Sequence, residues 1–506
     1  MSSERPPLRT QPRASSGVPG LDDILIGGWP ANHLYLVEGD PGTGKTTLAL
    51  QFLLEGARLG DPVLYVTLSE SKKELEGVAE SHHWPLNGVS IFEYAPTEEN
   101  LRPENEYSAL HPSEVEFQDT MQGILTKVEQ VRPTRLVFDS LSEVRLLARE
   151  SLRYRRQVLA LKHFFLNRSC TVLMLDDKTS ESHDLQLQSI AHGVLLLERL
   201  ARDYGVERRR LRVAKLRGAR FREGFHDYTI ETGGLKVFPR LVAGEHRLSS
   251  DDGMAESGLP ALDALLGGGL PRGTSTLLTG PAGCGKSSLA VRYAYAAAQR
   301  GEATALYHFD EGLGTLQARS AQLGMDLASH IKAGTMEIKQ FDPAELSPGE
   351  FASFVRDAVE HRRARVVVID SLNGLLNSMA GEQQLMLQMH ELCTFLNQRG
   401  VVTLLVLSQA GILGAHMASP VDISYLADNV LLLRYFESNG EVRKALSVLK
   451  KRSGVHERTI RELRIQEGKI EIGEPLTAFH GVLTGVPRYT GSSSALEGAM
   501  DEQRKP

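Results

Sequence analysis

Short apolar runs alternate with helical patterns of apolar and polar residues along most of the chain. The runs are continuous stretches of Val, Ile and Leu, which is typical of parallel strands covered by helices on both faces. In the first half they predict strands at His33–Glu38, Val63–Leu68, Arg135–Asp139, Thr171–Leu175 and Val194–Glu198. In the second half they predict strands at Ser275–Thr279, Ala303–Phe309, Val366–Asp370, Val401–Leu407 and Val430–Arg434. The pattern therefore predicts an α/β fold, and two closing runs, Leu211–Leu216 and Ala445–Leu449, predict the start of an antiparallel extension in each half.

The sequence contains an internal duplication. The segment Ser16–Leu25 recurs as Ser257–Leu266, and Lys286 follows Lys45 by 241 residues (286 − 45). Both matches keep the same spacing, so no gap separates these landmarks. A repeat of this length indicates two similar domains in tandem, not a solenoid of short units.

A polar stretch rich in Gly, Ser and Asp, Ala243–Gly253, separates the two copies. We therefore predict a first domain at residues 1–245 and a second at residues 246–490. Residues 491–506 are small and polar, and we expect them to form a disordered tail.

Composition narrows the class of protein without naming a function. Of 506 residues, 41% are hydrophobic and 24% are charged, which excludes a mainly disordered or collagenous chain. Three cysteines are too few for a disulfide framework. A net charge of −6 does not require a nucleic-acid partner, although it leaves local basic patches open. The apolar runs are shorter than a membrane span and the start has no signal-like segment, so we expect a cytoplasmic protein with no membrane partner.

Two glycine-rich loops carry the strongest chemical signal. Each follows a predicted strand, has the spacing Gly-x4-Gly-Lys-Thr/Ser of a Walker A loop, and opens a predicted helix, at Thr47–Ala57 and Ser288–Gln299. Backbone amides of such a loop bind phosphate, the lysine reaches the β- and γ-phosphates, and the following hydroxyl helps to hold Mg²⁺. The predicted ATP-binding residues are Gly39, Gly42, Thr43, Gly44, Lys45, Thr46 and Thr47 in the first copy and Gly280, Gly283, Cys284, Gly285, Lys286, Ser287 and Ser288 in the second.

Carboxylates follow two of the predicted strands in each copy. Asp139 and Asp370 end apolar strands, as Walker B aspartates do when they support Mg²⁺ together with Thr46 and Ser287. If the chain had no Walker A loops, Asp139 and Asp370 would be better explained as aspartates that cap a helix or form a turn. Glu70 and Glu311 follow another strand, where a carboxylate would orient or deprotonate the attacking water, although acids that begin a surface helix look the same.

The segment from Arg199 to Arg222 is strongly basic. Few aromatic residues interleave with its basic residues, so a solvated pair of strands explains them better than a nucleic-acid surface. Within the stretch, the pair Lys215 and Arg217 recurs in the second copy as Lys450 and Arg452. In a strand this spacing places both charges on one face.

With tandem Walker A loops, paired Ser-Gly-x-Pro-x-Leu-Asp openings and Lys-x-Arg elements, the chain resembles the KaiC family, circadian-clock ATPases and autokinases of the RecA superfamily. The resemblance covers roughly residues 15–490. It implies two RecA-like P-loop domains, Mg²⁺ and ATP as cofactors, and a homo-oligomer, a hexamer of two stacked rings, with regulatory protein partners. It also implies that Lys215, Arg217, Lys450 and Arg452 reach the γ-phosphate of a neighbouring subunit.

The sequence departs from the family pattern at two points. Family clock members have two adjacent glutamates where this chain has Ser69-Glu70 and Asp310-Glu311, so Asp310 joins Glu311 as a candidate catalytic residue of the second copy. Family autophosphorylation uses an adjacent Ser-Thr pair, and Ser424-Tyr425 aligns with it. The resemblance thus makes Ser424 the candidate phosphoacceptor of a serine/threonine autokinase.

Two functions remain open from the sequence: an ATP-hydrolysing, self-phosphorylating signalling hexamer, and a RecA-like DNA-dependent motor or recombinase. We favour the first, because a DNA-acting protein would be expected to bring a basic stacking surface or an added DNA-binding module.

Overall fold

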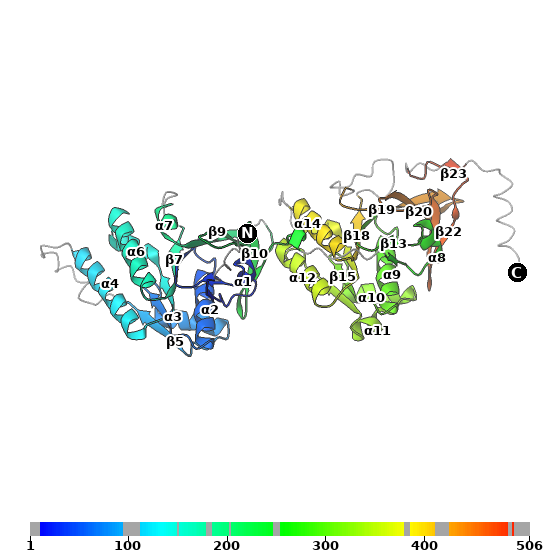
Figure 1. Cartoon of the computed structure of the whole chain (residues 1–506). Helices are drawn as coiled ribbons and strands as arrows, with labels where there is room; N and C mark the ends of the chain where they lie inside the picture. Colours follow the sequence, from blue (N-terminus) through cyan, green and yellow to red (C-terminus); the bar gives the residue numbers. More distant parts are fainter. Residues whose placement is uncertain are drawn as a thin grey trace, which may run out of the picture. The chain divides into compact units, whose positions relative to one another are not determined.

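The computed structural model describes residues 11–94, 112–148, 151–178, 185–201, 204–245, 253–378, 385–409, 425–483 and 488–489. The chain divides into two compact units, residues 1–240 and residues 241–506 (Figure 1). The predicted tail at residues 491–506 and the candidate phosphoacceptor Ser424 lie outside the described residues.

The first unit is built on a nine-stranded sheet in the order β11-β10-β9-β8-β3-β7-β6-β4-β5. Its parallel strands are β3 (Leu34–Gly39), β4 (Val63–Thr67), β5 (Val89–Glu93), β6 (Arg135–Asp139), β7 (Thr171–Asp177) and β8 (Gly193–Leu200). An antiparallel extension follows, with β9 (Arg208–Leu216), β10 (His226–Glu231) and β11 (Gly234–Phe238). The helices are α1 (Leu21–Ile24), α2 (Lys45–Arg58), α3 (Lys72–Ser81), α4 (Pro112–Val131), α5 (Leu141–Ala148), α6 (Ser151–Leu166) and α7 (Leu185–Ile190), and β1 (Arg13–Ala14) pairs with β2 (Trp29–Pro30).

The second unit repeats this order in a sheet arranged β16-β15-β17-β18-β14-β19-β20-β21-β22. Its parallel strands are β14 (Ser275–Gly280), β15 (Thr304–His308), β16 (Met336–Gln340), β17 (Val366–Asp370), β18 (Val402–Ser408) and β19 (Asn429–Ser438). The antiparallel strands are β20 (Glu441–Lys451), β21 (Arg461–Gln466) and β22 (Lys469–Pro475). The helices are α8 (Pro260–Leu265), α9 (Lys286–Gln299), α10 (Leu313–Gln322), α11 (Leu327–Lys332), α12 (Pro348–Glu360), α13 (Leu372–Ser378) and α14 (Leu385–Gln398), with a 3₁₀ turn η3 (Ala243–Glu245). Two small pairs complete it: β12 (Met254–Ala255) with β13 (Leu270–Pro271), and β23 (Phe479–His480) with β24 (Arg488–Tyr489).

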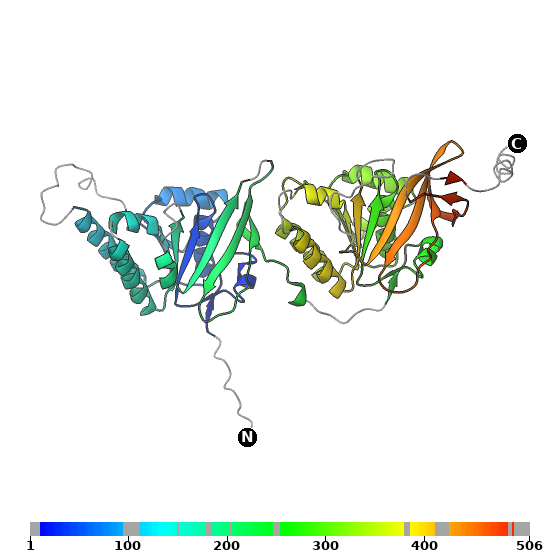
Figure 2. The same ribbon diagram turned by 90° about the horizontal axis from the view of Figure 1, so that it is seen from above.

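Helices cover both faces of each sheet, as Figure 2 shows. Successive residues of the central strand β3 enter different cores: Tyr35 and Val37 pack in one apolar cluster, and Leu34 and Leu36 in the other. A strand buried on both faces needs apolar residues at every position, which is why β3 reads as a continuous apolar run. The predicted α/β class with two tandem RecA-like domains is therefore confirmed.

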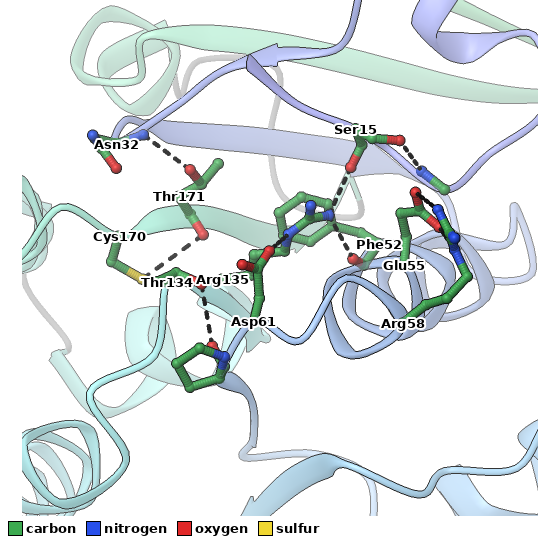
Figure 3. A network of polar contacts seen from close by, with 12 residues as sticks. Ser15, Asn32, Phe52, Glu55, Arg58, Asp61, Thr134, Arg135, Cys170 and Thr171 are labelled. Carbon is green, nitrogen blue, oxygen red and sulfur yellow. Dashed lines mark hydrogen bonds and ion pairs between the residues drawn. The ribbon is translucent and has the colours of Figure 1, made fainter. Parts of the chain in front are cut away.

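A buried arginine ties elements of the first unit together (Figure 3). Arg135 at the start of β6 donates to Asp61 at 2.9 Å, to the Ser15 carbonyl at 2.7 Å and to the Phe52 carbonyl at 3.2 Å. These bonds link the sheet to α2 and to the segment before α1. They hold the helix that follows the Walker A loop against the sheet.

The described helices include none with the length and apolar content that crossing a membrane requires.

Candidate nucleotide sites

The glycine-rich loop of the first unit leaves the central strand β3 and enters α2 at Lys45. Gly44, directly before the helix, has φ 90°, and a Cβ there would lie 2.5 Å from Cδ1 of Ile230. A side chain at this position would therefore be strained and would collide with β10. No side chain caps the start of α2, so its first N–H groups remain available for an anion.

Lys45 lies along the loop and meets an acidic partner that the sequence analysis missed. Its Nζ donates to the carbonyls of Gly39 at 2.8 Å and Asp40 at 3.1 Å, and forms an ion pair of 2.7 Å with Asp177. Asp177 ends β7 opposite Gly39 in the register of the sheet. An aspartate at the end of an apolar strand was a visible signal, but sequence spacing did not relate it to Lys45.

The predicted metal and catalytic carboxylates of the first unit converge beside the loop. Thr46 Oγ1 donates to Glu70 Oε1 at 3.4 Å, and Asp139 at the end of β6 accepts a 2.6 Å bond from the Tyr65 hydroxyl. The other oxygen of Glu70, Oε2, is buried and has no hydrogen-bond partner within the described ranges. Burial, followed by the nearby charge of Asp139, raises the pKa of Glu70. Burial also raises the pKa of Asp139.

These groups fit a magnesium-bound nucleoside triphosphate. A hydroxyl, the buried carboxylate of Asp139 and the partly buried carboxylate of Glu70 face one place, and one oxygen of Glu70 there has no hydrogen-bond donor in the described chain. Oxygen ligands of this kind suit Mg²⁺. Thr43, whose Oγ1 donates to the Asp40 carbonyl, shapes the loop, and Thr47 is buried in the first turn of α2.

The second unit repeats the loop between β14 and α9, beside a cavity of about 990 Å³. Lys286 is buried and donates to the Pro281 carbonyl at 2.7 Å, and its Nζ lies 3.8 Å from Cys284 Sγ. Burial lowers the pKa of Lys286. The cavity lining includes most of the predicted residues of this site: Gly283, Gly285, Lys286, Ser287, Ser288, Asp310, Glu311 and Asp370. Gly280 ends the strand that leads into the loop.

Asp370, the predicted metal-supporting aspartate of the second unit, has a different environment from Asp139 in the first. Burial raises the pKa of Asp370, and a hydrogen bond from the Ser287 side chain acts in the opposite direction. His308 lies beside it, with Nδ1 3.7 Å from Asp370 Oδ2, and burial lowers its pKa to about 4. The imidazole is therefore neutral near pH 7.

The two candidate catalytic acids of the second unit, Asp310 and Glu311, both accept hydrogen bonds from other side chains. Ser371 Oγ donates to Asp310 Oδ2 at 2.5 Å. Glu311 accepts bonds of 3.2 Å and 2.7 Å from Arg319, a residue of α10 that the sequence analysis did not single out. No motif spacing marks Arg319, because the contact depends on how α10 packs.

The recurring Lys-x-Arg elements lie at the opposite end of each sheet from the Walker A loop. Lys215 is paired with Val194 near the start of β8, whereas Gly39 is paired with Leu197 further along the same strand. Lys215 donates to the carbonyls of Gln188 at 2.5 Å and Ala191 at 2.9 Å, and Arg217 donates to Ser189 at 2.7 Å.

The second copy shows the same arrangement. Lys450 pairs with Val430 at the start of β19 and donates to the Ala427 carbonyl at 2.7 Å. Arg452 forms a 3.1 Å ion pair with Asp428, which is buried and accepts bonds from the Ser275 backbone and Asn397. Asp428 thus anchors the chain four residues after Ser424.

Two arginines of the basic stretch in the first unit form ion pairs with acidic residues of their own sheet. Arg208 forms a buried two-bond ion pair with Asp227, and Arg210 pairs with Glu198 at 2.9 Å. β8 and β9 form the antiparallel pair that the sequence predicted. Charges neutralised in this way are poorly placed to bind nucleic acid.

Together the glycine-rich loops, their lysines and the strand-end carboxylates define a P-loop ATPase of RecA-like fold, present twice in one chain. A family model described as the ATPase KaiC matches residues 14–242 and again residues 255–477. The chain belongs to the KaiC family of ATPases.

Curated relatives agree over nearly the full length. The circadian clock protein KaiC3 of Synechocystis sp. is 26% identical over 505 residues, covering 97% of this chain and 98% of the relative. The circadian clock oscillator protein KaiC of Picosynechococcus sp. is 26% identical over 482 residues, covering 93% and 91%. That of Synechococcus elongatus is 25% identical over 486 residues, covering 93% and 91%.

Proposed function

We propose that both units bind Mg²⁺ and ATP and hydrolyse the γ-phosphoryl bond, with Lys45 and Lys286 on the phosphates. Thr46 with Asp139, and Ser287 with Asp370, would hold Mg²⁺, which neutralises phosphate charge when bound. The observation that carries this proposal is the contact of Thr46 with Glu70 beside Lys45, which joins the start of α2 to the segment that follows β4, 24 residues further along the chain.

Glu70 suits the role of general base in the first unit. Burial, followed by the nearby charge of Asp139, raises its pKa toward the operating pH, where a base transfers protons most effectively. One oxygen is buried without a partner among the described residues, so a water proton would have an acceptor there. In the second unit Glu311 or Asp310 takes this role.

We further propose that the chain works as a cytoplasmic ring-shaped homo-oligomer, a hexamer, in which Lys215, Arg217, Lys450 and Arg452 act on a neighbour's γ-phosphate. Support comes from the strand register within each unit. Each Lys-x-Arg pair lies roughly 10 Å or more from the Walker A loop of its own unit, measured along the strands. A residue at that end of the sheet is better placed to serve a site on another copy. The carbonyls and the Asp428 carboxylate that these side chains now contact would be exchanged for phosphate oxygens.

The finer activity that we propose is serine autophosphorylation at Ser424 in a regulatory or signalling role with protein partners. The Ser424 oxygen would attack the γ-phosphorus, the bond to ADP would break, and the hydroxyl proton would pass to Glu311 or Asp310. Tyr425, whose side chain is 55% exposed, cannot replace a threonine without moving the hydroxyl by the length of a ring. We therefore expect one dominant phosphosite.

One set of measurements on the full chain tests this proposal. Incubation with Mg²⁺ and ATP should increase the mass measured by light scattering, release ADP, and label the peptide that spans residues 423–428. ADP release without that label would leave an ATPase that lacks the autokinase step. Absence of both bound nucleotide and ADP would contradict the proposed function as a whole.

A further inference from the structure

Arg319 lies on α10 and faces the nucleotide cavity of the second unit. Its three guanidinium nitrogens all donate. Nε and Nη2 bond the two oxygens of Glu311 at 3.2 Å and 2.7 Å, and Nη1 bonds the Ser288 hydroxyl at 2.9 Å. The arginine therefore joins the candidate base to the Walker A loop.

The two-bond geometry fixes the direction of the Glu311 carboxylate. A planar guanidinium matches a carboxylate with two parallel bonds, and such pairs are stronger and more directional than a lysine contact. Both partners are only partly exposed, with side-chain exposures of 30% for Arg319 and 26% for Glu311. Each carboxylate oxygen thus has a lone pair committed to Arg319 in place of water.

The first unit provides an internal comparison. Val78 occupies the position equivalent to Arg319, at the spacing of 241 residues (319 − 78) that relates the two copies. Its neighbour Glu70 has no arginine partner within the described ranges, and Oε2 of Glu70 is buried without a hydrogen bond. The equivalent carboxylate therefore has a two-bond arginine partner in the second copy, whereas Glu70 in the first accepts a 3.4 Å bond from Thr46 and keeps one oxygen unbonded within the described ranges.

We propose that Arg319 is a positioning residue that holds Glu311 away from the attacking water and so slows ATP hydrolysis in the second unit. This inference rests on the proposed function and takes Glu311, one of its two candidate bases, as the base of that unit. In hydrolysis the water oxygen bonds the γ-phosphorus, the bond to ADP breaks, and a water proton passes to the carboxylate. While both oxygens accept from Arg319, Glu311 must first break a bond to Arg319 and turn before it can accept that proton.

The hydrogen bond from Arg319 to Ser288 connects the Arg319–Glu311 pair, called the clamp below, to the Walker A loop. Ser288 follows Ser287 in the first turn of α9, next to the phosphate-binding amides. A nucleotide that changes the position of Ser288 therefore changes the support of Arg319. The second unit would therefore retain ATP for longer than the first.

The test uses the full chain with Lys45→Ala, so that hydrolysis reports the second unit. Adding Arg319→Val should raise kcat by on the order of tenfold. Arg319→Lys keeps the positive charge but loses the two-bond guanidinium geometry, so it should raise kcat by less. It provides the same test if the valine variant does not fold. In the presence of Glu311→Gln, Arg319→Val should have no effect on kcat, whereas a merely structural role of Arg319 would change kcat with either residue at position 311.

The reciprocal variant is Val78→Arg in a Lys286→Ala chain, and it should lower kcat of the first unit. Bound nucleotide is measured in every chain. An unchanged or lower kcat in both Arg319 variants, with nucleotide still bound, overturns the clamp alone. Loss of bound nucleotide in the Lys45→Ala chain that retains Arg319 would instead contradict the proposed function of the second unit.

Discussion

At the scale of residues, the ion pair between Lys45 and Asp177 distinguishes the first nucleotide site from the second. The pair is 2.7 Å long, and Asp177 is one-third exposed. Ser408 holds the equivalent place, because it pairs with Gly280 as Asp177 pairs with Gly39. ATP must therefore compete with a carboxylate for Lys45, whereas Lys286 meets no such competitor at the equivalent position.

Asp177→Ser should tighten ATP binding by the first unit. The gain is modest, about 0.5–1 kcal/mol or a few-fold in Kd, because water screens a partly exposed pair. A titration with a fluorescent ATP analogue in a Lys286→Ala chain measures it. Ser408→Asp in a Lys45→Ala chain is the matched control and should weaken binding. Weaker binding after Asp177→Ser would show that the carboxylate supports the site.

The spacing of residues in the sequence predicted the site residues that belong to one motif. It did not predict the site residues whose position depends on tertiary packing. Walker A residues are contiguous, so their grouping is local. Tyr65, Asp177 and Arg319 reach the site from other strands or a helix, and their side-chain directions follow from tertiary packing. A single sequence carries no signal for such contacts.

At the scale of elements, the strands buried on both faces were predicted closely and the edge strands were not. β6 and β17 agree residue for residue with the predicted ranges, because a continuous apolar run marks a central strand. β5 and β16 were not predicted. Their sequences mix polar and apolar residues, and most of their side chains are only partly buried. β19 and β20, which form a hairpin, are longer than predicted, since hairpin tips tolerate polar residues.

His226 at the start of β10 should make the first unit sensitive to acid. Its Nδ1 accepts from the Arg240 backbone N–H at 2.8 Å and its Nε2 contacts the Arg222 carbonyl at 3.0 Å. The neutral ring satisfies both contacts. Burial, chiefly, lowers its pKa to about 4, against 6.5 for an ordinary histidine.

The unfolded chain therefore binds a proton between pH 6.5 and 4 that the folded unit does not, so stability falls as pH falls through this range. The contribution of this residue is at most about 3 kcal/mol. Urea unfolding of the parent and of His226→Gln at pH 7 and pH 5 measures it. The variant should lose less stability on acidification than the parent. Equal losses would contradict a neutral buried imidazole.

At the scale of the whole molecule, nucleotide and assembly should depend on each other. ATP that binds at a shared interface favours the assembled state by mass action. Arg217→Ala should lower turnover by the first unit although it leaves the Walker A loop intact, because the variant loses the cation that we propose to act on a neighbour's γ-phosphate.

Mixing two inactive chains tests whether that contribution crosses between copies. A Lys45→Ala chain keeps Arg217 and an Arg217→Ala chain keeps Lys45, so mixed assemblies contain some complete first-unit sites. In a Lys286→Ala background for both chains, the steady-state ADP release of the mixture should exceed the average of the two alone. No recovery at any mixing ratio would count against sites completed by a neighbour.

The most direct test of the central claim counts nucleotides on purified full-length chains after incubation with Mg²⁺ and ATP. The parent should hold two nucleotides per chain, Lys45→Ala and Lys286→Ala one each, and the double variant none, with ADP release falling in the same order. A double variant that binds and hydrolyses ATP like the parent would contradict the assignment of both sites.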